Sequence, residues 1–157
     1  AMAVRRIIEN RWGANNTRNK NFAICGDMND YQERISISGD RRSGYSFTPV
    51  EEERSALDIF TADDFVTNPM SRRDVMDRWT LYHSRGPQEQ HLCQLDYIWL
   101  SPSLAERNAK RVPEIIRAGQ PFRTIFPPGQ AVERYPRVGC DRPKASDPCP
   151  IVMGRYL

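Results

Sequence analysis

Three acidic residues stand beside short apolar runs or inside one, where a strand can present a carboxylate to a cleft. They are Asp27 after the run 22–25, Asp96 inside the run 95–100, and Asp147 before the run 151–153. Carboxylates on three strands of one sheet could act together on a ligand. We therefore expect one site that a sheet assembles.

The first stretch combines a strand end with a tight turn. Gly26 allows the bend that turns Asp27 out of the strand, and Asn29 follows in the same turn. Ligands bind at the carboxyl ends of strands in open α/β sheets, which favours a chemical role for both side chains. Gly, Asp and Asn are also common turn formers, so a purely structural Asx-rich turn explains the same residues.

Asp96 lies in a run that is apolar on both faces, which predicts a central strand. A buried carboxylate costs on the order of several kcal/mol unless it is paired. Asp96 therefore needs a partner such as a histidine, an arginine or several N–H groups. His83 and His91 are the only histidines, and because both flank a predicted turn we expect surface positions, with metal ligation as the alternative.

Length and composition bound the class of protein. A chain of 157 residues predicts a single domain over 1–157. An apolar share of 39% and a charged share of 27% are typical of a soluble globular protein. No apolar run approaches the roughly 20 residues that span a bilayer. The four cysteines lack the close spacing of a zinc site, Cys25 and Cys93 are expected to be buried and reduced, and we expect a cytoplasmic protein.

Charge is unevenly distributed along the chain. The formal net charge is only +3, but basic residues outnumber acidic ones over 107–144, whereas 51–64 is acidic. A basic segment is compatible with a phosphate-bearing ligand. A solvated surface explains the same charges.

The first third of the chain predicts two helices. Apolar residues at helical spacing predict an amphipathic helix over 2–12, and its lack of an N-cap resembles the end of a longer element. We expect a loop over 31–47. The capping-box arrangement Thr48-Pro49-Val50-Glu51 then predicts a helix that buries Val50, Leu57 and Phe60.

The rest of the chain predicts short strands joined by loops. Residues 79–83 should form a strand, 84–91 a polar connection, and the next apolar run its hairpin partner. We further expect irregular or short helical structure over 61–77, a helical turn over 104–111, a strand over 112–117 and a long loop over 118–144.

The order of three motifs resembles the C-terminal half of the endonuclease/exonuclease/phosphatase family, which includes apurinic endonucleases, deoxyribonuclease I and inositol phosphatases. The motifs are Gly26-Asp27-Met28-Asn29, Leu95-Asp96-Tyr97-Ile98 preceded by Arg78-Trp79-Thr80, and Ser146-Asp147-Pro148-Cys149-Pro150-Ile151. The resemblance implies an α/β fold, the C-terminal half of a four-layer α/β sandwich, with a mostly antiparallel or mixed sheet flanked by helices.

The resemblance also implies a role for each acidic residue in metal-dependent phosphate-ester hydrolysis. Asp27 would align or deprotonate the attacking water, and Asn29 would hold a phosphate oxygen. Asp147 would lie near the metal, with Asp27 as a second ligand, and Asp96 would pair with the histidine of a Ser-Asp-His motif. Such oxygen ligands suit Mg²⁺ or Mn²⁺.

The sequence departs from the family pattern at Pro148, where the family has that histidine. Proline offers neither a titratable group nor an N–H donor. The N-terminal half, with its metal-binding glutamate, also has no counterpart here. We expect a hydrolase of phosphodiesters or phosphomonoesters that is impaired or inactive as this chain alone. The alternatives are a non-catalytic module that binds nucleic acid or a protein, and an α/β domain whose Asp and Asn residues only form turns.

The expected partners follow from this reading. The substrate is a phosphate ester, with nucleic acid among the candidates, and we expect no membrane span. A sheet built to pack on a second sheet exposes an apolar face when alone. We therefore expect the chain to associate with the missing N-terminal half or with itself.

Overall fold

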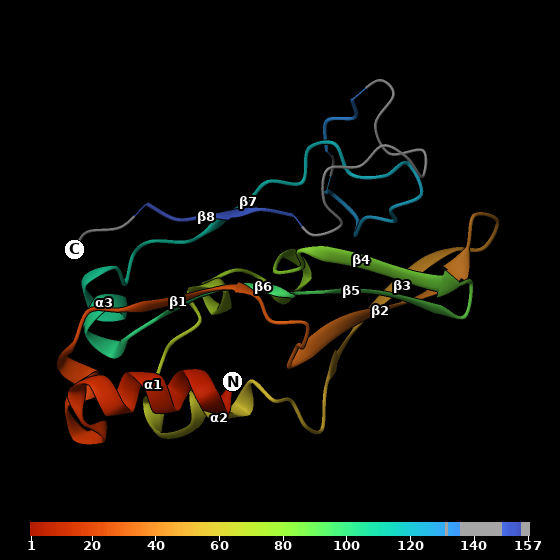
Figure 1. Ribbon diagram of the computed structural model, residues 1–157. Helices are drawn as coiled ribbons and strands as arrows, with labels where there is room; N and C mark the ends of the chain where they lie inside the picture. Colours follow the sequence, from red (N-terminus) through yellow and green to blue (C-terminus); the bar gives the residue numbers. More distant parts are fainter. Residues whose placement is uncertain (131, 136–148, 155–157) are drawn as a thin grey trace.

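The computed structural model describes residues 1–130, 132–135 and 149–154, which form an α/β protein with antiparallel sheets (Figure 1). No helix in these ranges is long and apolar enough to cross a membrane. The α-helices are α1 (Met2–Trp12), α2 (Asp58–Thr61) and α3 (Pro102–Arg107), and the 3-10 helices are η1 (Ala14–Asn19), η2 (Ala62–Asp64), η3 (Pro69–Arg72) and η4 (Val75–Asp77). The strands are β1 (Ala23–Asp27), β2 (Glu33–Asp40), β3 (Gly44–Glu51), β4 (Leu81–Gly86), β5 (Glu89–Cys93), β6 (Asp96–Leu100), β7 (Glu114–Ile115) and β8 (Ile151–Val152).

The described strands form three sheets. Four strands make the largest, in the order β3-β2-β5-β4, while β1 pairs with β6 and β7 with β8. Every pairing is antiparallel. In Figure 1, α1 and α2 lie on one side of β1 and β6, and the β7–β8 ribbon lies on the other.

Three groups of buried side chains hold these layers together. Tyr97 and Trp99 of β6 pack with Phe60 of α2 on the helical side of β1 and β6. Ile35 and Leu92 of the four-stranded sheet pack in a second cluster that also takes in residues after β6. Alternate residues of a strand point to opposite faces, and β6 is buried on both: Tyr97 and Trp99 belong to the cluster on the helical side, while Leu100 belongs to a third cluster with Leu104 of α3.

The elements around the acidic residues form largely as expected. The helix over 2–12 is α1, and its N-cap Ala1 makes no side-chain capping bond. The apolar runs before Asp27, around Asp96 and after Cys149 become β1, β6 and β8. On the side away from β1, β6 makes an isolated bridge between Leu100 and Thr67, so it has a neighbour on both edges, as predicted for a central strand.

The expected loop over 31–47 is wrong, and so is the helix start at Thr48, although Leu57 and Phe60 are buried as expected, at the short α2. Both segments belong to the β2–β3 hairpin, in which Ile35 pairs with Pro49 and Ile37 with Phe47. Apolar residues alternate with polar ones in this segment, which is the two-residue period of a strand. The serines among the polar residues led us to expect a loop instead. Pro49 is tolerated because β3 is an edge strand.

The hairpin after Thr80 forms with a different partner from the one expected. The strand that pairs with β4 is β5, which starts already at Glu89, whereas the apolar run after it pairs with β1. Polar residues of the predicted connection over 84–91 therefore belong to the ladder. Among them, His91 pairs with His83 and Gln90 with Ser84. The predicted helical turn becomes α3, the strand over 112–117 shortens to β7, and no helix or strand occurs over 118–130 or 132–135.

Candidate functional site

Two of the predicted acidic residues face each other on neighbouring strands. Asp27 ends β1, Asp96 begins β6, and the two are partners in the antiparallel register. The Met28 N–H donates to the Leu95 carbonyl at 2.8 Å and closes the ladder beyond them. Residues directly opposite each other in an antiparallel pair share a face of the sheet. The end of β1 lies beside the start of β6 because the two strands are antiparallel. The fold therefore brings these two carboxylates together.

Asp27 and Asn29 form an exposed turn, so the structural reading of the first motif is correct in part. The Asn29 N–H donates to Oδ1 of Asp27 at 2.8 Å, which is an Asx turn. Asn29 has φ 51°, a left-handed conformation that asparagine tolerates. Both residues are exposed to solvent. The turn fixes the Asp27 carboxylate and leaves it open to a ligand.

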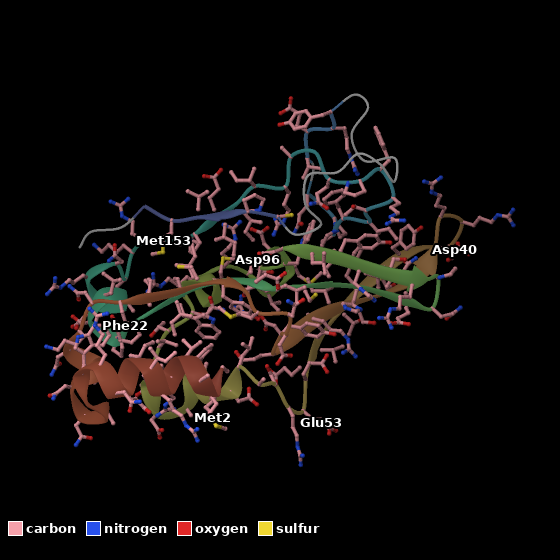
Figure 2. The ribbon with its side chains drawn as sticks, viewed as in Figure 1. Met2, Phe22, Asp40, Glu53, Asp96 and Met153 are labelled. Atoms are coloured by element: carbon pink, nitrogen blue, oxygen red, sulfur yellow. The ribbon has the colours of Figure 1, made fainter. Side chains whose placement is uncertain are left out.

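Asp96 is half-buried near the middle of the molecule, where β4 begins (Figure 2). Its Oδ2 is buried and has no hydrogen-bond partner among the described residues. Burial raises the pKa of Asp96, a hydrogen bond with the Thr80 side chain opposes that rise, and the charge of Asp27 adds to it. We expected a histidine, an arginine or several N–H groups as partner, and within the described ranges the side chain finds a threonine hydroxyl instead.

The third acidic stretch is described only from Cys149 onward, and Asp147 and Pro148 lie outside the described residues. The Cys149 N–H donates to the Thr80 carbonyl at 2.7 Å. Through Cys149, the third motif therefore lies against Thr80, whose hydroxyl accepts the Asp96 N–H at 3.3 Å. All three motifs contribute a described residue to this neighbourhood.

The cysteines divide into buried and exposed thiols. Cys93 and Cys149 are buried, and burial raises the pKa of each thiol to about 12, so both are neutral at physiological pH. Cys93 was expected to be buried, and this is confirmed. The expectation for Cys25 is wrong, because its side chain is exposed to solvent. Its apolar neighbours had suggested a strand that is buried on both sides.

Sequence reasoning did not single out Thr80 and Gln94. Thr80 is fully buried, and Gln94 is only 4% exposed. The Gln94 side chain donates to the Asp96 carbonyl at 2.9 Å and accepts from Asn68 at 3.1 Å. The signal in the sequence that these two side chains are buried was weak, because a single polar residue beside an apolar run also occurs at the surface.

The two histidines are half-buried, so the expected surface position is only partly right. Their rings stack with centroids 4.7 Å apart, and the Tyr31 ring packs against His91. Burial, together with the neighbouring charge of His83, lowers the pKa of His91 to about 4. Across the described ranges, no three His, Cys, Asp or Glu side chains are grouped as a metal site.

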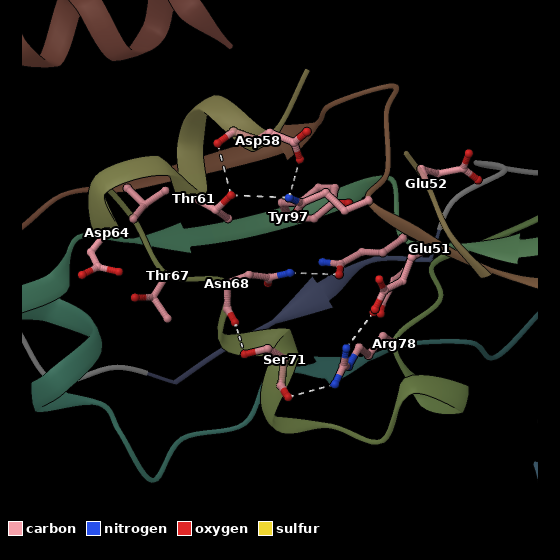
Figure 3. Close-up of a pocket in the computed structure, with 14 residues that line it drawn as sticks. Glu51, Glu52, Asp58, Thr61, Asp64, Thr67, Asn68, Ser71, Arg78 and Tyr97 are labelled. Carbon is pink, nitrogen blue, oxygen red and sulfur yellow. Dashed lines mark hydrogen bonds and ion pairs between the residues drawn. The ribbon is translucent and has the colours of Figure 1, made fainter. Parts of the chain in front are cut away.

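A separate acidic pocket lies beside the four-stranded sheet (Figure 3). Its volume is about 560 Å³, and none of the predicted site residues lines it. Arg78 binds Glu33 and the Ser71 carbonyl on one side, and Gln32 binds Asp58 on the other. Its remaining acidic residues are Glu51, Glu52 and Asp64.

Comparisons of the chain with protein-family models, curated proteins and solved structures find no match. The case for a function therefore rests on the motifs and on the geometry around Asp27 and Asp96.

Proposed function

We propose that this chain is the C-terminal half of an endonuclease/exonuclease/phosphatase domain, a four-layer sandwich, and that it contributes part of a phosphoesterase site that uses Mg²⁺ or Mn²⁺. The observation that supports this most is the register pair of Asp27 and Asp96. Two carboxylates opposite each other, one exposed and one half-buried, are costly in a purely structural ladder, because like charges repel. A shared chemical task explains why they stand there.

The environments of the two carboxylates suit different tasks. Asp27 is exposed and held by its own turn, so it can orient a water molecule or bind a cation. Asn29 beside it offers an amide N–H₂ to a phosphate oxygen. Asp96 is partly desolvated, and its raised pKa suits a group that holds or exchanges a proton.

The metal would be held by Asp27 together with Asp147. Carboxylate oxygens fit Mg²⁺ or Mn²⁺, and the exposed Asp27 side chain is accessible to such an ion. The bound ion would neutralise charge that develops on the phosphate. Asp27 would orient the water, Asn29 would bind the phosphate, and Asp96 would hold or exchange a proton.

Activity of the chain alone should be low. Pro148 offers no imidazole, and the buried Oδ2 of Asp96 has no partner among the described residues. A bound phosphate ester would therefore lie near Asp27, which orients the water, but it would lack the histidine donor that the resemblance predicts at position 148. We further propose that a complementary half, or a second copy of the chain, completes the site.

Metal binding and turnover test this function together. Calorimetry with Mn²⁺ should show binding that Asp27→Asn weakens at least about tenfold, since the amide keeps the Oδ1 acceptor of the turn but loses the charge. Asp40→Asn is the matched control, because Asp40 accepts N–H groups in another exposed turn. Mn²⁺ binding that is unaffected by Asp27→Asn would refute the proposed metal site.

Turnover should be measured on an abasic DNA duplex and on a generic phosphodiester with Mg²⁺. We expect little or no cleavage by the chain alone. Robust cleavage that Asp27→Ala abolishes would show that Pro148 does not impair the enzyme.

The alternative is a non-catalytic module, which Pro148 itself favours. The change Pro148→His separates the two possibilities. Cleavage gained by this variant would indicate a damaged enzyme, whereas continued inactivity together with binding of duplex DNA would indicate a module.

A further inference from the structure

The outer edge of β3 is a surface that the described fold leaves unpaired. β3 is an outer strand of the four-stranded sheet, and among the described residues only β2 pairs with it. The turn between β2 and β3 lies at the far end of the molecule from α1 and α3 (Figure 1). We propose that this edge pairs with β3 of a second copy of the chain, in antiparallel orientation, so that the two sheets become one. The proposal goes beyond the proposed function and does not depend on it.

The backbone groups that face the open edge belong to Tyr45 and Phe47. Residues of an antiparallel pair alternate between those that exchange backbone hydrogen bonds and those that do not. The Glu52 N–H donates to the Gln32 carbonyl at 2.9 Å, one residue beyond the end of the β2–β3 ladder. The even-numbered residues of β3 therefore bond to β2. It follows that the N–H and carbonyl groups of Tyr45 and Phe47 point away from β2.

This edge carries few of the features that keep edge strands apart. Such strands usually have charged side chains, bulges or prolines. Residues 44–50 include no charged side chain, and the register of β2 and β3 runs without a shift. Pro49 is the exception, because it lies at an outward position and has no N–H to offer. Tyr45 and Phe47 are therefore the residues that can pair.

One register satisfies these backbone groups and avoids Pro49. If Tyr45 lies opposite Phe47 of the second copy, the two-fold axis places the remaining Phe47 opposite the remaining Tyr45. Each of these residues then exchanges both of its backbone hydrogen bonds. A register with Phe47 opposite itself would place Tyr45 opposite Pro49, which lacks the donor.

The side chains support the same register. Those of Tyr45 and Phe47 are half-buried and pack against the cluster that contains Ile35 and Leu92. Paired residues of an antiparallel ladder lie on one face, so Tyr45 of each copy would contact Phe47 of the other as a cross-strand aromatic pair. The pairing therefore extends an apolar core that the chain already has.

Charge at the two ends of β3 selects a second copy as the partner. The turn before β3 carries Arg41 and Arg42, whereas Glu51 and Glu53 lie at and after its other end. These four side chains are exposed, and none of them is in an ion pair among the described residues. Antiparallel pairing brings the basic end of each copy to the acidic end of the other. In the register above, Arg41 lies across from Glu51.

Amide hydrogen exchange followed by NMR tests the pairing in the full chain. The chain used carries Ile116→Ser and Val152→Ser, which remove exposed apolar side chains from the β7–β8 side. The ladder is short and exposed ion pairs contribute little, so the pairing should be weak and require concentrations near the millimolar range. The amides of Tyr45 and Phe47 should exchange fast in dilute solution and several times more slowly in concentrated solution.

The amides of Ser46 and Thr48 are the internal control. By the alternation along β3 they bond to β2, so they should exchange slowly at every concentration. Fast exchange of Tyr45 and Phe47 at every concentration would overturn the proposal. Slow exchange that does not depend on concentration would show that another part of the same chain covers the edge, and it would also overturn the proposal.

A charge exchange distinguishes this pairing from other kinds of self-association. Arg41→Glu with Arg42→Glu makes both ends of β3 acidic, and Glu51→Arg with Glu53→Arg makes both ends basic. Because the four positions are exposed, both double variants should keep the fold. Each variant alone should lose the concentration-dependent protection of Tyr45 and Phe47.

An equal mixture of the two double variants should regain this protection, because each acidic end then meets a basic one. Protection that each variant keeps on its own would show that charge does not select the partner. A mixture that stays unprotected would show that the two ends do not meet. Either result contradicts a second copy paired through β3.

Discussion

Asp96 is the residue at which stability and chemistry conflict. A half-buried carboxylate opposite a second carboxylate, with one oxygen that lacks a described partner, destabilises the fold in its ionised form. Its raised pKa has a definite consequence for stability. The extra stability of the protonated form is fully present below the unfolded-state pKa, and it is lost as pH rises through the folded-state pKa.

We expect Asp96→Asn to be more stable than the wild type at neutral pH. The gain should be on the order of 1 kcal/mol, the scale of a poorly satisfied buried polar group. The difference should shrink as pH falls through the raised pKa, because the wild-type carboxyl then becomes neutral. Urea denaturation of the variant and the wild type at each pH between 7 and 4 measures this difference. A variant less stable than the wild type at pH 7 would contradict the prediction.

His91 should give the opposite pH dependence. Its folded-state pKa of about 4 lies below the ordinary 6.5, because the ring is buried beside His83 and Arg34, with Glu89 opposing them. Stability is therefore present above about pH 6.5 and is lost as pH falls toward 4.

The change His91→Gln tests this dependence. Between pH 7 and pH 4 the wild type should lose roughly 1–2 kcal/mol of folding stability through His91, after allowance for solvent screening of a half-buried ring. The His91→Gln variant should not show this loss. The measurement is the difference between the urea midpoints of the two proteins at each pH. Two parallel midpoint curves from pH 7 to pH 4 would show that His91 does not titrate in this way.

Residue types alone could identify Asp96 as a candidate, because a carboxylate inside an apolar run is costly unless it is paired, and they could identify Asp27 and Asn29 because both follow a predicted strand end. They could not reveal the partner of Asp96. Thr80 becomes that partner only after β5 and β6 have brought residues from different parts of the chain together. A local reading has no access to such a contact.

At the scale of elements, continuous apolar runs were predicted well and mixed ones poorly. β1 and β6 coincide with continuous apolar runs, which predicted a strand at each place. The β2–β3 hairpin was missed because its outward residues are serines and threonines, which are typical of loops. The capping box at Thr48 was outweighed because a cap contributes only about 1 kcal/mol, whereas the hairpin ladder extends from Glu33 to Glu51.

Two glycines of this hairpin give a matched test. Gly39 has φ +95°, and a Cβ there would lie 2.1 Å from the Gly44 carbonyl oxygen, while Gly44 has φ +87° and no atom within 4 Å of the added Cβ. Gly39→Ala should therefore cost about 2–3 kcal/mol and Gly44→Ala about 1 kcal/mol. Chemical denaturation measures both. Equal and small losses would favour the loop that we first expected.

At the scale of the whole molecule, part of the apolar surface is left uncovered. Val152 of β8 is 52% exposed, and Ile116, just after β7, is 39% exposed. Ile7 of α1 is 67% exposed on the opposite side of β1 and β6. Large contiguous apolar patches are rare on soluble monomers.

We expect the chain to self-associate through the β7–β8 side at high micromolar concentration. The double variant Ile116→Ser with Val152→Ser should lower the association constant about tenfold or more, because it removes apolar area from that side. Ile7→Ser serves as the control on the other side. Sedimentation equilibrium that shows a wild-type monomer throughout this range would contradict the expectation.

The β1–β6 ladder connects residues that are nearly half the chain apart, with Asp27 opposite Asp96. Closing so long a loop costs entropy that local hairpins such as β2–β3 do not pay. The hairpins should therefore form early and the β1–β6 pairing late in folding. Asp27 and Asp96 consequently come together only as folding nears completion, so a nascent or partly unfolded chain exposes both carboxylates without ever presenting them as a pair.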